Sequence, residues 1–246
     1  ENLTARRTSV CCMAAAAHCE VVPVDMGIAG VPVPGAVDRR VAPGTRDFTQ
    51  GPAMTREQAV QAVAAGIELV RTQKQNGVQL LATGEMGIGN TTTSSAVAAV
   101  LLGHPAAEMT GRGAGLTSEG LVRKINAIKK AIALNEPDPE DAIDVLAKVG
   151  GLDIAGMAGV FLGGAVYGIP VVMDGFISCV SALIAMRICP AARDYILASH
   201  VSKEPAAHLI LENMGKEAII HADMCLGEGT GAVALFPLHD LAAATV

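Results

Sequence analysis

Aromatic residues are scarce in this chain of 246 residues, which contains no Trp, two Tyr and four Phe. Base-stacking surfaces and membrane belts rely on aromatic side chains, so this scarcity argues against both. Positive charge is also low, because 18 Lys and Arg against 24 Asp and Glu give a net charge of −6, and basic groupings such as Arg6-Arg7 and Lys129-Lys130 are isolated pairs. Neither feature suits contact with a phosphate backbone, and we predict that the protein binds no nucleic acid.

Cysteine patterns that hold zinc are missing as well. The six cysteines include no C-x-x-C pair and no Cys/His spacing of the zinc type. We therefore expect no metal site and interpret the cysteines as small core hydrophobes, namely Cys11, Cys12, Cys19, Cys179, Cys189 and Cys225. The chain opens at Glu1 without the basic, apolar and cleavage-site pattern of a secretory signal, and the cytoplasm is the expected compartment.

One uncharged run, residues 154–173, is long enough to cross a bilayer, and a second run follows Asp174 as far as residue 186. Several glycines, Pro170 and the pair Asp174-Gly175 interrupt this stretch. These interruptions favour a buried helix, a break at residues 168–170 and a short buried strand at residues 171–173 over a membrane span. We predict no contact with a membrane.

Apolar, β-rich segments alternate with helical segments along the chain. The expected strands share one feature, a polar or ionisable residue within two positions of their end: residues 21–24 before Asp25, 78–83 before Gly84-Glu85, 171–173 before Asp174, and 195–198 before Ser199-His200. Helices at about 91–102, 177–188 and 205–214 follow the last three. This alternation predicts an α/β fold, a Rossmann-like parallel sheet with helices on both faces, plus a small helical subdomain. Ligands bind at the carboxyl ends of such strands, so we expect the four polar residues at the site.

Local signals place two further helices and a loop. Thr55 and Gln58 form a capping-box pattern that predicts a helix to about residue 75. Asp138 followed by Pro139 predicts the cap and first turn of a helix that ends at about residue 149. Residues 30–52 are rich in proline and glycine and predict a long irregular loop.

The sharpest motif is Gly84-Glu85-Met86-Gly87-Ile88-Gly89-Asn90-Thr91, at a predicted strand-to-helix junction. Glycines allow close backbone approach, and unpaired amides at a helix start favour an anion such as phosphate. No Lys follows the last glycine, as a P-loop requires, and Thr92 stands where G-x-G-x-x-G has its third glycine. A purely structural turn, capped by threonines, is the alternative.

A second glycine cluster, Gly111-Arg112-Gly113-Ala114-Gly115, precedes a helix with an apolar stripe. Two such loops near one sheet edge would hold opposite sides of a phosphorylated ligand. Lys124 and Lys129 both flank the stripe, so periodicity alone does not decide which of them points inward.

Near the carboxyl end, Leu226-Gly227-Glu228-Gly229-Thr230-Gly231 places one carboxylate among glycines before an apolar segment. Glu228 would either cap a following helix through its first-turn amides or, in a water-poor pocket, remove a proton as a general base. Spacing leaves both alternatives open. No G-x-S-x-G elbow supports Ser-His-Asp hydrolysis, and for His200 a structural role is favoured.

Taken with residues 145–151, 157–159, 174–178 and 199–200, these loops resemble, in order and spacing, the nicotinate-nucleotide:dimethylbenzimidazole phosphoribosyltransferase family of cobalamin assembly. The likeness runs from about Leu3 to Leu241. It implies transfer of phosphoribosyl from nicotinate mononucleotide to 5,6-dimethylbenzimidazole, which gives α-ribazole 5′-phosphate and nicotinate with inversion at the anomeric carbon. It also implies no cofactor, a homodimer, and one phosphoribosyltransferase domain over residues 1–246.

The resemblance also assigns roles to residues. Glu228 matches the general base that acts on the benzimidazole nitrogen, and Lys124 matches a phosphate contact. The remaining positions match substrate-binding residues: Glu85, Gly87, Gly89, Asn90, Thr91, Gly111, Arg112, Gly113, Asp174 and Leu226.

One departure concerns the amino-terminal quarter of the family, which has no counterpart before Glu1. That segment supplies part of the benzimidazole pocket, so we expect the nucleotide half of the site to be the more complete half. A homologue that binds the nucleotide without catalysing transfer is therefore the alternative function.

Overall fold

The computed structural model describes residues 2–113 and 115–245. Three short strands form a parallel sheet in the order β3 (Leu81–Ala82), β4 (Val171–Met173) and β5 (Ile196–Ala198). A second parallel pair joins β1 (Val24–Asp25) to β2 (Val37–Asp38).

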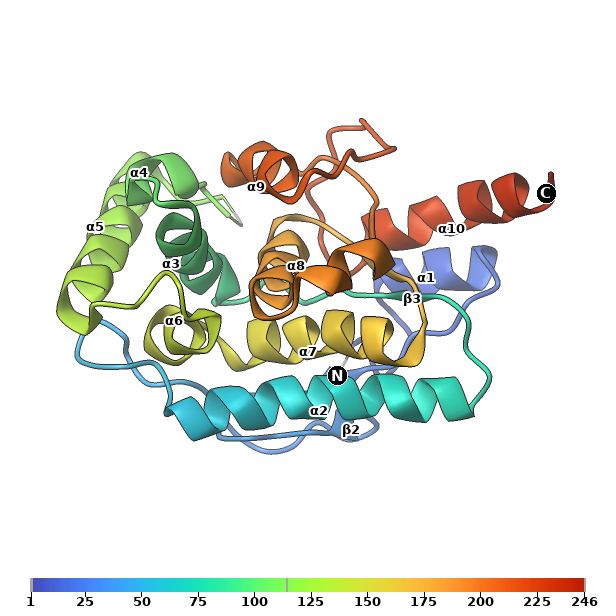
Figure 1. Cartoon of the computed structure of the whole chain (residues 1–246), viewed down its shortest axis with the longest axis horizontal. Helices are drawn as coiled ribbons and strands as arrows, with labels where there is room; N and C mark the ends of the chain where they lie inside the picture. Colours follow the sequence, from blue (N-terminus) through green and yellow to red (C-terminus); the bar gives the residue numbers. More distant parts are fainter. Residues whose placement is uncertain (1, 114, 246) are drawn as a thin grey trace.

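Helices make up most of the described chain (Figure 1). They are α1 (Ser9–Ala16), α2 (Arg56–Gln75), α3 (Asn90–Leu102), α4 (Ala106–Met109), α5 (Ser118–Asn135), α6 (Ala142–Val149), α7 (Leu152–Tyr167), α8 (Phe176–Ile188), a 3-10 turn (Pro190–Tyr195), α9 (Ala206–Met214) and α10 (Thr230–Ala243).

The three-stranded sheet is covered by helices on both faces, as expected. Alternate side chains of a strand point to opposite faces. On one face, Val171 and Met173 join the main core with Phe161 of α7. On the other, Val172 packs with Leu235 of α10. The predicted α/β architecture is confirmed, although the strands are short and the core is largely helical.

Helices α2 and α7 run side by side along the lower edge of Figure 1, and their backbones touch. A Cβ added at Gly66 would clash with the carbonyl oxygen of Gly156, and one added at Gly159 would clash with the carbonyl oxygen of Val63. Glycine is needed at both positions because the close approach leaves no room for a side chain.

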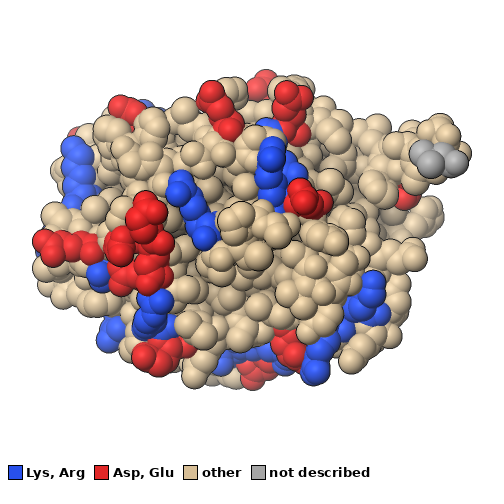
Figure 2. Space-filling view, in the orientation of Figure 1, with Lys and Arg blue, Asp and Glu red and all other residues tan. Residues whose placement is uncertain are grey.

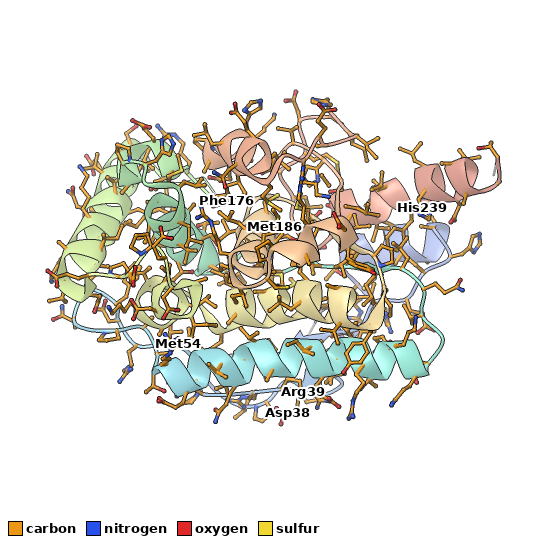
Figure 3. All side chains as sticks on the ribbon, in the orientation of Figure 1. Asp38, Arg39, Met54, Phe176, Met186 and His239 are labelled. Atoms are coloured by element: carbon orange, nitrogen blue, oxygen red, sulfur yellow. The ribbon has the colours of Figure 1, made fainter. Side chains whose placement is uncertain are left out.

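Helices α3 to α6 gather at the left end of Figure 1. Their buried side chains include Met109, Ile128 and Leu146, which belong to the same core cluster as the strands β4 and β5. At the opposite end α10 extends beyond the body, and His239 lies on this extension in Figure 3.

Several predicted boundaries are confirmed. Thr55 and Gln58 form the capping box of α2, with the Gln58 N–H donating to Thr55 Oγ1 at 3.2 Å and the Thr55 N–H to Gln58 Oε1 at 2.9 Å. Helix α7 ends at Gly168, which has a φ of 65° and leads into β4. Within residues 2–113 and 115–245, no helix combines the length and apolar character needed to cross a bilayer.

Other boundaries differ from the prediction. Asp138 does not cap α6; Asp141 does, since its Oδ1 accepts the N–H groups of Ile143 and Asp144, whereas Asp138 accepts the Glu140 N–H in the preceding turn. Two aspartates in sequence compete for this role, and the helix starts after the second.

The strands are also shorter than expected. Of the predicted strand at residues 21–24, only Val24 lies in β1. Of the predicted strand at residues 78–83, only Leu81 and Ala82 form β3. The loop at residues 30–52 holds the missed strand β2, whose Val37 lies opposite Val24. A parallel pair this short leaves no periodicity in the sequence.

The cysteines only partly behave as core residues. Cys11 and Cys179 are buried, Cys19 and Cys189 are partly buried, and Cys12 and Cys225 are exposed.

Charged residues of both signs are interspersed on the face drawn in Figure 2.

Candidate active site

The two glutamates of the glycine loops lie next to each other. The Glu228 N–H donates to the carbonyl oxygen of Glu85 at 2.9 Å. A Cβ added at Gly84 would lie 2.6 Å from the carbonyl oxygen of Glu228, so glycine is required for this contact. The carboxyl end of β3 therefore meets the loop that leads into α10.

The Glu85 carboxylate is held from one side by a buried asparagine. Glu85 Oε2 accepts the Gly87 N–H and, at 2.9 Å, a hydrogen of Asn90 Nδ2. The same Nδ2 also donates to Asp153 Oδ2 at 2.8 Å. Burial raises the pKa of Glu85, the hydrogen bonds from Asn90 and Gly87 oppose this effect, and the charges of Asp153 and Asp174 add to it.

The glycine loop leads into α3 without a side chain that caps the helix. Gly87 and Gly89 have φ values of 71° and 80°, which favour glycine. Gly89 is the N-cap of α3 and has no side chain to accept the first amides. The threonines do not cap this helix: Thr93 donates to the Asn90 carbonyl oxygen, and Thr91 Oγ1 accepts from Lys124.

Lys124 connects the two glycine clusters. Its Nζ donates to Thr91 Oγ1 at 3.0 Å and to the carbonyl oxygen of Gly111 at 3.1 Å. Only 7% of Lys124 is exposed, whereas Lys129 is exposed to solvent, so Lys124 is the inward-facing lysine. Burial lowers the pKa of Lys124, and the charge of Glu204 partly offsets that effect. We call Gly111, Gly113 and Lys124 the anion cradle.

The anion cradle contains an acidic side chain that the sequence did not reveal. Glu204 Oε1 accepts the Gly113 N–H at 3.1 Å. Glu204 Oε2 is buried and has no hydrogen-bond partner among the described residues, and it occupies the space that a Cβ of Gly111 would need. Glu204 follows β5 and His200, and the rule that ligands bind at the carboxyl ends of parallel strands points to this loop.

Arg112 does not face the cradle. Its guanidinium donates to the Leu116 carbonyl oxygen at 2.7 Å and to Ser118 Oγ at 3.1 Å, and the side chain is exposed. These bonds hold the turn before α5, and in this structure Arg112 contributes no charge to the anion cradle.

Asp174 is fully engaged with the backbone. Its Oδ1 accepts the N–H groups of Gly231 and Ala232 at 2.8 and 3.1 Å, and its Oδ2 accepts the Gly229 N–H at 3.1 Å. The side chain is buried. Asp174 thus caps α10, and the alternative in which Glu228 caps that helix is wrong.

Glu228 binds a different helix. Its Oε2 accepts the Val10 N–H at 3.2 Å, in the first turn of α1. Its backbone has a φ of 63°, between glycines with φ values of 78° and 93°. A positive φ is costly at Glu228 but not at the two glycines. The loop is held by the bond from the Glu228 N–H to the Glu85 carbonyl oxygen and by the bond from the Gly229 N–H to the Asp174 carboxylate.

His200 completes the support of this loop. Its Nδ1 lies 3.0 Å from Ser199 Oγ and 3.9 Å from Asp174 Oδ1. A Cβ at Gly231 would clash with the imidazole. His200 therefore packs against the start of α10, in keeping with the structural role expected of it. Burial lowers the pKa of His200, and the Asp174 charge opposes this shift.

Exposed apolar residues lie close in sequence to the two glutamates. Leu226 is 60% exposed, and Met86 and Ile88 of the other loop are 46% and 85% exposed. Exposed apolar residues on two adjacent loops suit a flat organic ring.

Asp25 does not belong with this group. It lies in β1, accepts the Gly27 and Ile28 N–H groups on Oδ1, and has Arg40 at 3.8 Å. The expectation that Asp25 shares a sheet edge with Glu85 and Asp174 is wrong, because β1 pairs with β2 rather than with the three-stranded sheet. Over the described residues, no three His, Cys, Asp or Glu side chains are grouped as metal ligands.

Comparison with known proteins shows the family of this chain. A family model described as phosphoribosyltransferase matches residues 1–246. A nicotinate-nucleotide--dimethylbenzimidazole phosphoribosyltransferase of Ruminiclostridium cellulolyticum is 49% identical over 99% of this chain and 70% of its own length. Proteins of the same name from Clostridium acetobutylicum and Geobacter metallireducens are 48% and 53% identical over 92% and 87% of the chain.

The chain spans 64% and 61% of the length of the last two relatives. The crystal structure of CobT from Thermus thermophilus superimposes with a TM-score of 0.93 at 42% identity, over 98% of this chain and 73% of that one. The fold that brings the Glu85 and Glu228 loops together thus matches that of a solved structure. The chain belongs to the nicotinate-nucleotide--dimethylbenzimidazole phosphoribosyltransferase family.

Proposed function

We propose that this chain transfers the phosphoribosyl group of nicotinate mononucleotide to 5,6-dimethylbenzimidazole, giving α-ribazole 5′-phosphate and nicotinate for the lower ligand of cobalamin. The observation that carries this proposal is the contact between Glu85 and Glu228, beside an anion cradle with a buried lysine. One sugar phosphate would fit between these groups.

In the proposed reaction, a ring nitrogen of the benzimidazole attacks the anomeric carbon as the bond from that carbon to the nicotinate nitrogen breaks. The bonding pair goes to the nicotinate ring, which loses its positive charge. Attack from the opposite face inverts the configuration. The proton on the second benzimidazole nitrogen passes to the Glu228 carboxylate.

Glu85 would act on the sugar. Displacement at an anomeric carbon builds positive charge on the ribose, and an ionised carboxylate in a water-poor site stabilises that charge. Gly87 and Asn90 fix the position of the Glu85 carboxylate before the reaction. Lys124 and the amides of the two glycine loops would hold the 5′-phosphate and orient the anomeric carbon.

The test is a product assay with nicotinate mononucleotide and dimethylbenzimidazole, followed by separation of nicotinate and α-ribazole phosphate. We expect both products in equal amounts. Nucleotide binding without product would overturn the proposal.

A second candidate function is nucleotide binding without transfer. The bond between Glu228 Oε2 and the Val10 N–H favours it, because the proposed base is already engaged in capping α1. The product assay separates the two candidates. The homodimer remains a prediction from the resemblance, and the cytoplasmic location remains a prediction from the sequence.

A further inference from the structure

Asn90 is held between two carboxylates. Its Nδ2 donates to Glu85 Oε2 at 2.9 Å and to Asp153 Oδ2 at 2.8 Å. An amide nitrogen carries two hydrogens, so both are used. Turning the amide over would place its oxygen against both carboxylates, and one orientation is therefore strongly favoured.

This orientation leaves the amide oxygen without a partner. Asn90 is 7% exposed, and its Oδ1 is buried and accepts no hydrogen bond from the described residues. A buried polar atom without a partner is costly. The oxygen thus calls for a donor from a bound molecule.

Asp153 lies outside the glycine loops, in the first turn of α7. Among the described residues, Asn90 is the one hydrogen-bond donor to the Asp153 carboxylate. The negative charge of Asp153 also raises the pKa of Glu85. A carboxylate in the first turn of a helix also interacts favourably with the helix dipole. Any test has to separate that role from an effect on Asn90.

We propose that Asp153 is a positioning residue, which orients the Asn90 amide so that its nitrogen holds Glu85 and its oxygen accepts a hydrogen bond from a sugar hydroxyl. This inference rests on the proposed function, since the sugar is that of the nucleotide. It assigns Asp153 no contact with the substrate.

The test compares three variants in nucleotide binding and in the pH dependence of kcat/KM. Asp153→Ala frees the amide, and we expect kcat/KM and nucleotide affinity to fall about tenfold, the effect of losing a hydrogen bond to a charged group. Asp153→Asn keeps an acceptor for Asn90 and should restore most of the activity. Glu119→Gln is the matched control, because Glu119 is an exposed acid in the first turn of α5, and it should change neither quantity.

The pH profile adds a readout of the electrostatic effect of Asp153 on Glu85, which the control Glu119→Gln should not move. Two negative charges act on the Glu85 carboxyl group, those of Asp153 in α7 and Asp174 before α8. The Asn90 amide and the Gly87 N–H donate hydrogen bonds to it. Glu228 lies beside the backbone of Glu85. Asp153→Asn removes one of the negative charges, so the acidic limb should move to lower pH. An unchanged limb would count against the proposal.

The proposal fails if Asp153→Ala matches the wild type in affinity and pH profile, or if Glu119→Gln shows the same losses. Thermal unfolding of each variant identifies any that are unfolded, in which case Asp153→Asn decides. If the wild type releases no nicotinate, the proposed function has failed, and calorimetric titration with nicotinate mononucleotide still decides whether Asp153 positions Asn90.

Discussion

The Glu228 N–H donates to the carbonyl oxygen of Glu85, and this bond places the two acidic side chains of the candidate active site on adjacent segments of backbone. The two segments are far apart in the sequence, since one follows β3 and the other precedes α10. Because a hydrogen bond joins the two backbones, a shift of one segment would also move the other. The relative position of Glu85, which would stabilise the sugar, and Glu228, which would take the proton, therefore depends on this backbone contact.

Replacing Glu228 by Gln tests its role as the base. The amide keeps the size of the side chain and can still accept the Val10 N–H, but it cannot take a proton. We expect kcat to fall by about a hundredfold or more, the usual effect of losing a general base, with little change in the affinity for nicotinate mononucleotide. An unaffected kcat would remove Glu228 from the reaction.

The raised pKa of Glu85 predicts an acidic limit to the activity. The ordinary pKa of Glu is about 4.3, and burial raises the pKa of this carboxyl above it. Because the ionised form is the active one, kcat/KM should fall as the pH drops through the raised value. Activity that stayed constant down to about pH 4 would contradict this assignment.

Lys124 and Lys129 form a matched pair for the anion cradle. Lys124→Met removes the ammonium that bonds to Thr91 and Gly111, while Lys129→Met changes an exposed residue of the same helix. We expect the first to weaken binding of inorganic phosphate at least about tenfold, the effect of losing a charged hydrogen bond, and the second to leave it unchanged. Phosphate titration followed by 31P NMR measures both. Equal effects would show that the phosphate does not bind there.

Glu204 competes with any anion for the Gly113 amide. Glu204→Gln removes a negative charge next to Lys124, and even in a water-like environment repulsion between charges about 4 Å apart is about 1 kcal/mol. Phosphate should therefore bind about fivefold more tightly. Weaker binding would mean instead that Glu204 holds the cradle in shape for the ligand.

The loss of Asp174 should affect the fold as well as the reaction. Asp174→Asn places an amide nitrogen against backbone N–H groups, so part of the α10 cap is lost. We expect destabilisation of about 2 kcal/mol, seen as a drop of roughly 5 °C in the midpoint of thermal unfolding. Exposed Asp240→Asn serves as the control, and equal midpoints for the two variants would contradict the capping role.

Much of this site could be predicted because glycine loops and strand ends are local features. Glu85, the loop after it and the end of β4 were expected together, and the structure places them together. The choice between Lys124 and Lys129 could not come from periodicity, because both flank one stripe, and burial settles it.

Two other features depend on contacts between distant segments. The cap of α10 comes from Asp174 rather than from the neighbouring Glu228, and Glu204 reaches Gly113 across the fold. Local spacing favours the nearest acid as a cap. Only tertiary packing decides which acid reaches the amides, and the same holds for the pairing of β2 with β1.

The close backbone contacts between α2 and α7 fix the position of α7 against α2. Helix α7 carries Asp153 in its first turn. A methyl group at Gly66 of α2 would clash with the carbonyl oxygen of Gly156 in α7 and push the two helices apart. We expect a displaced α7 to carry Asp153 away from Asn90, so that Gly66→Ala would lower the rate of the reaction although Gly66 lies outside the candidate site.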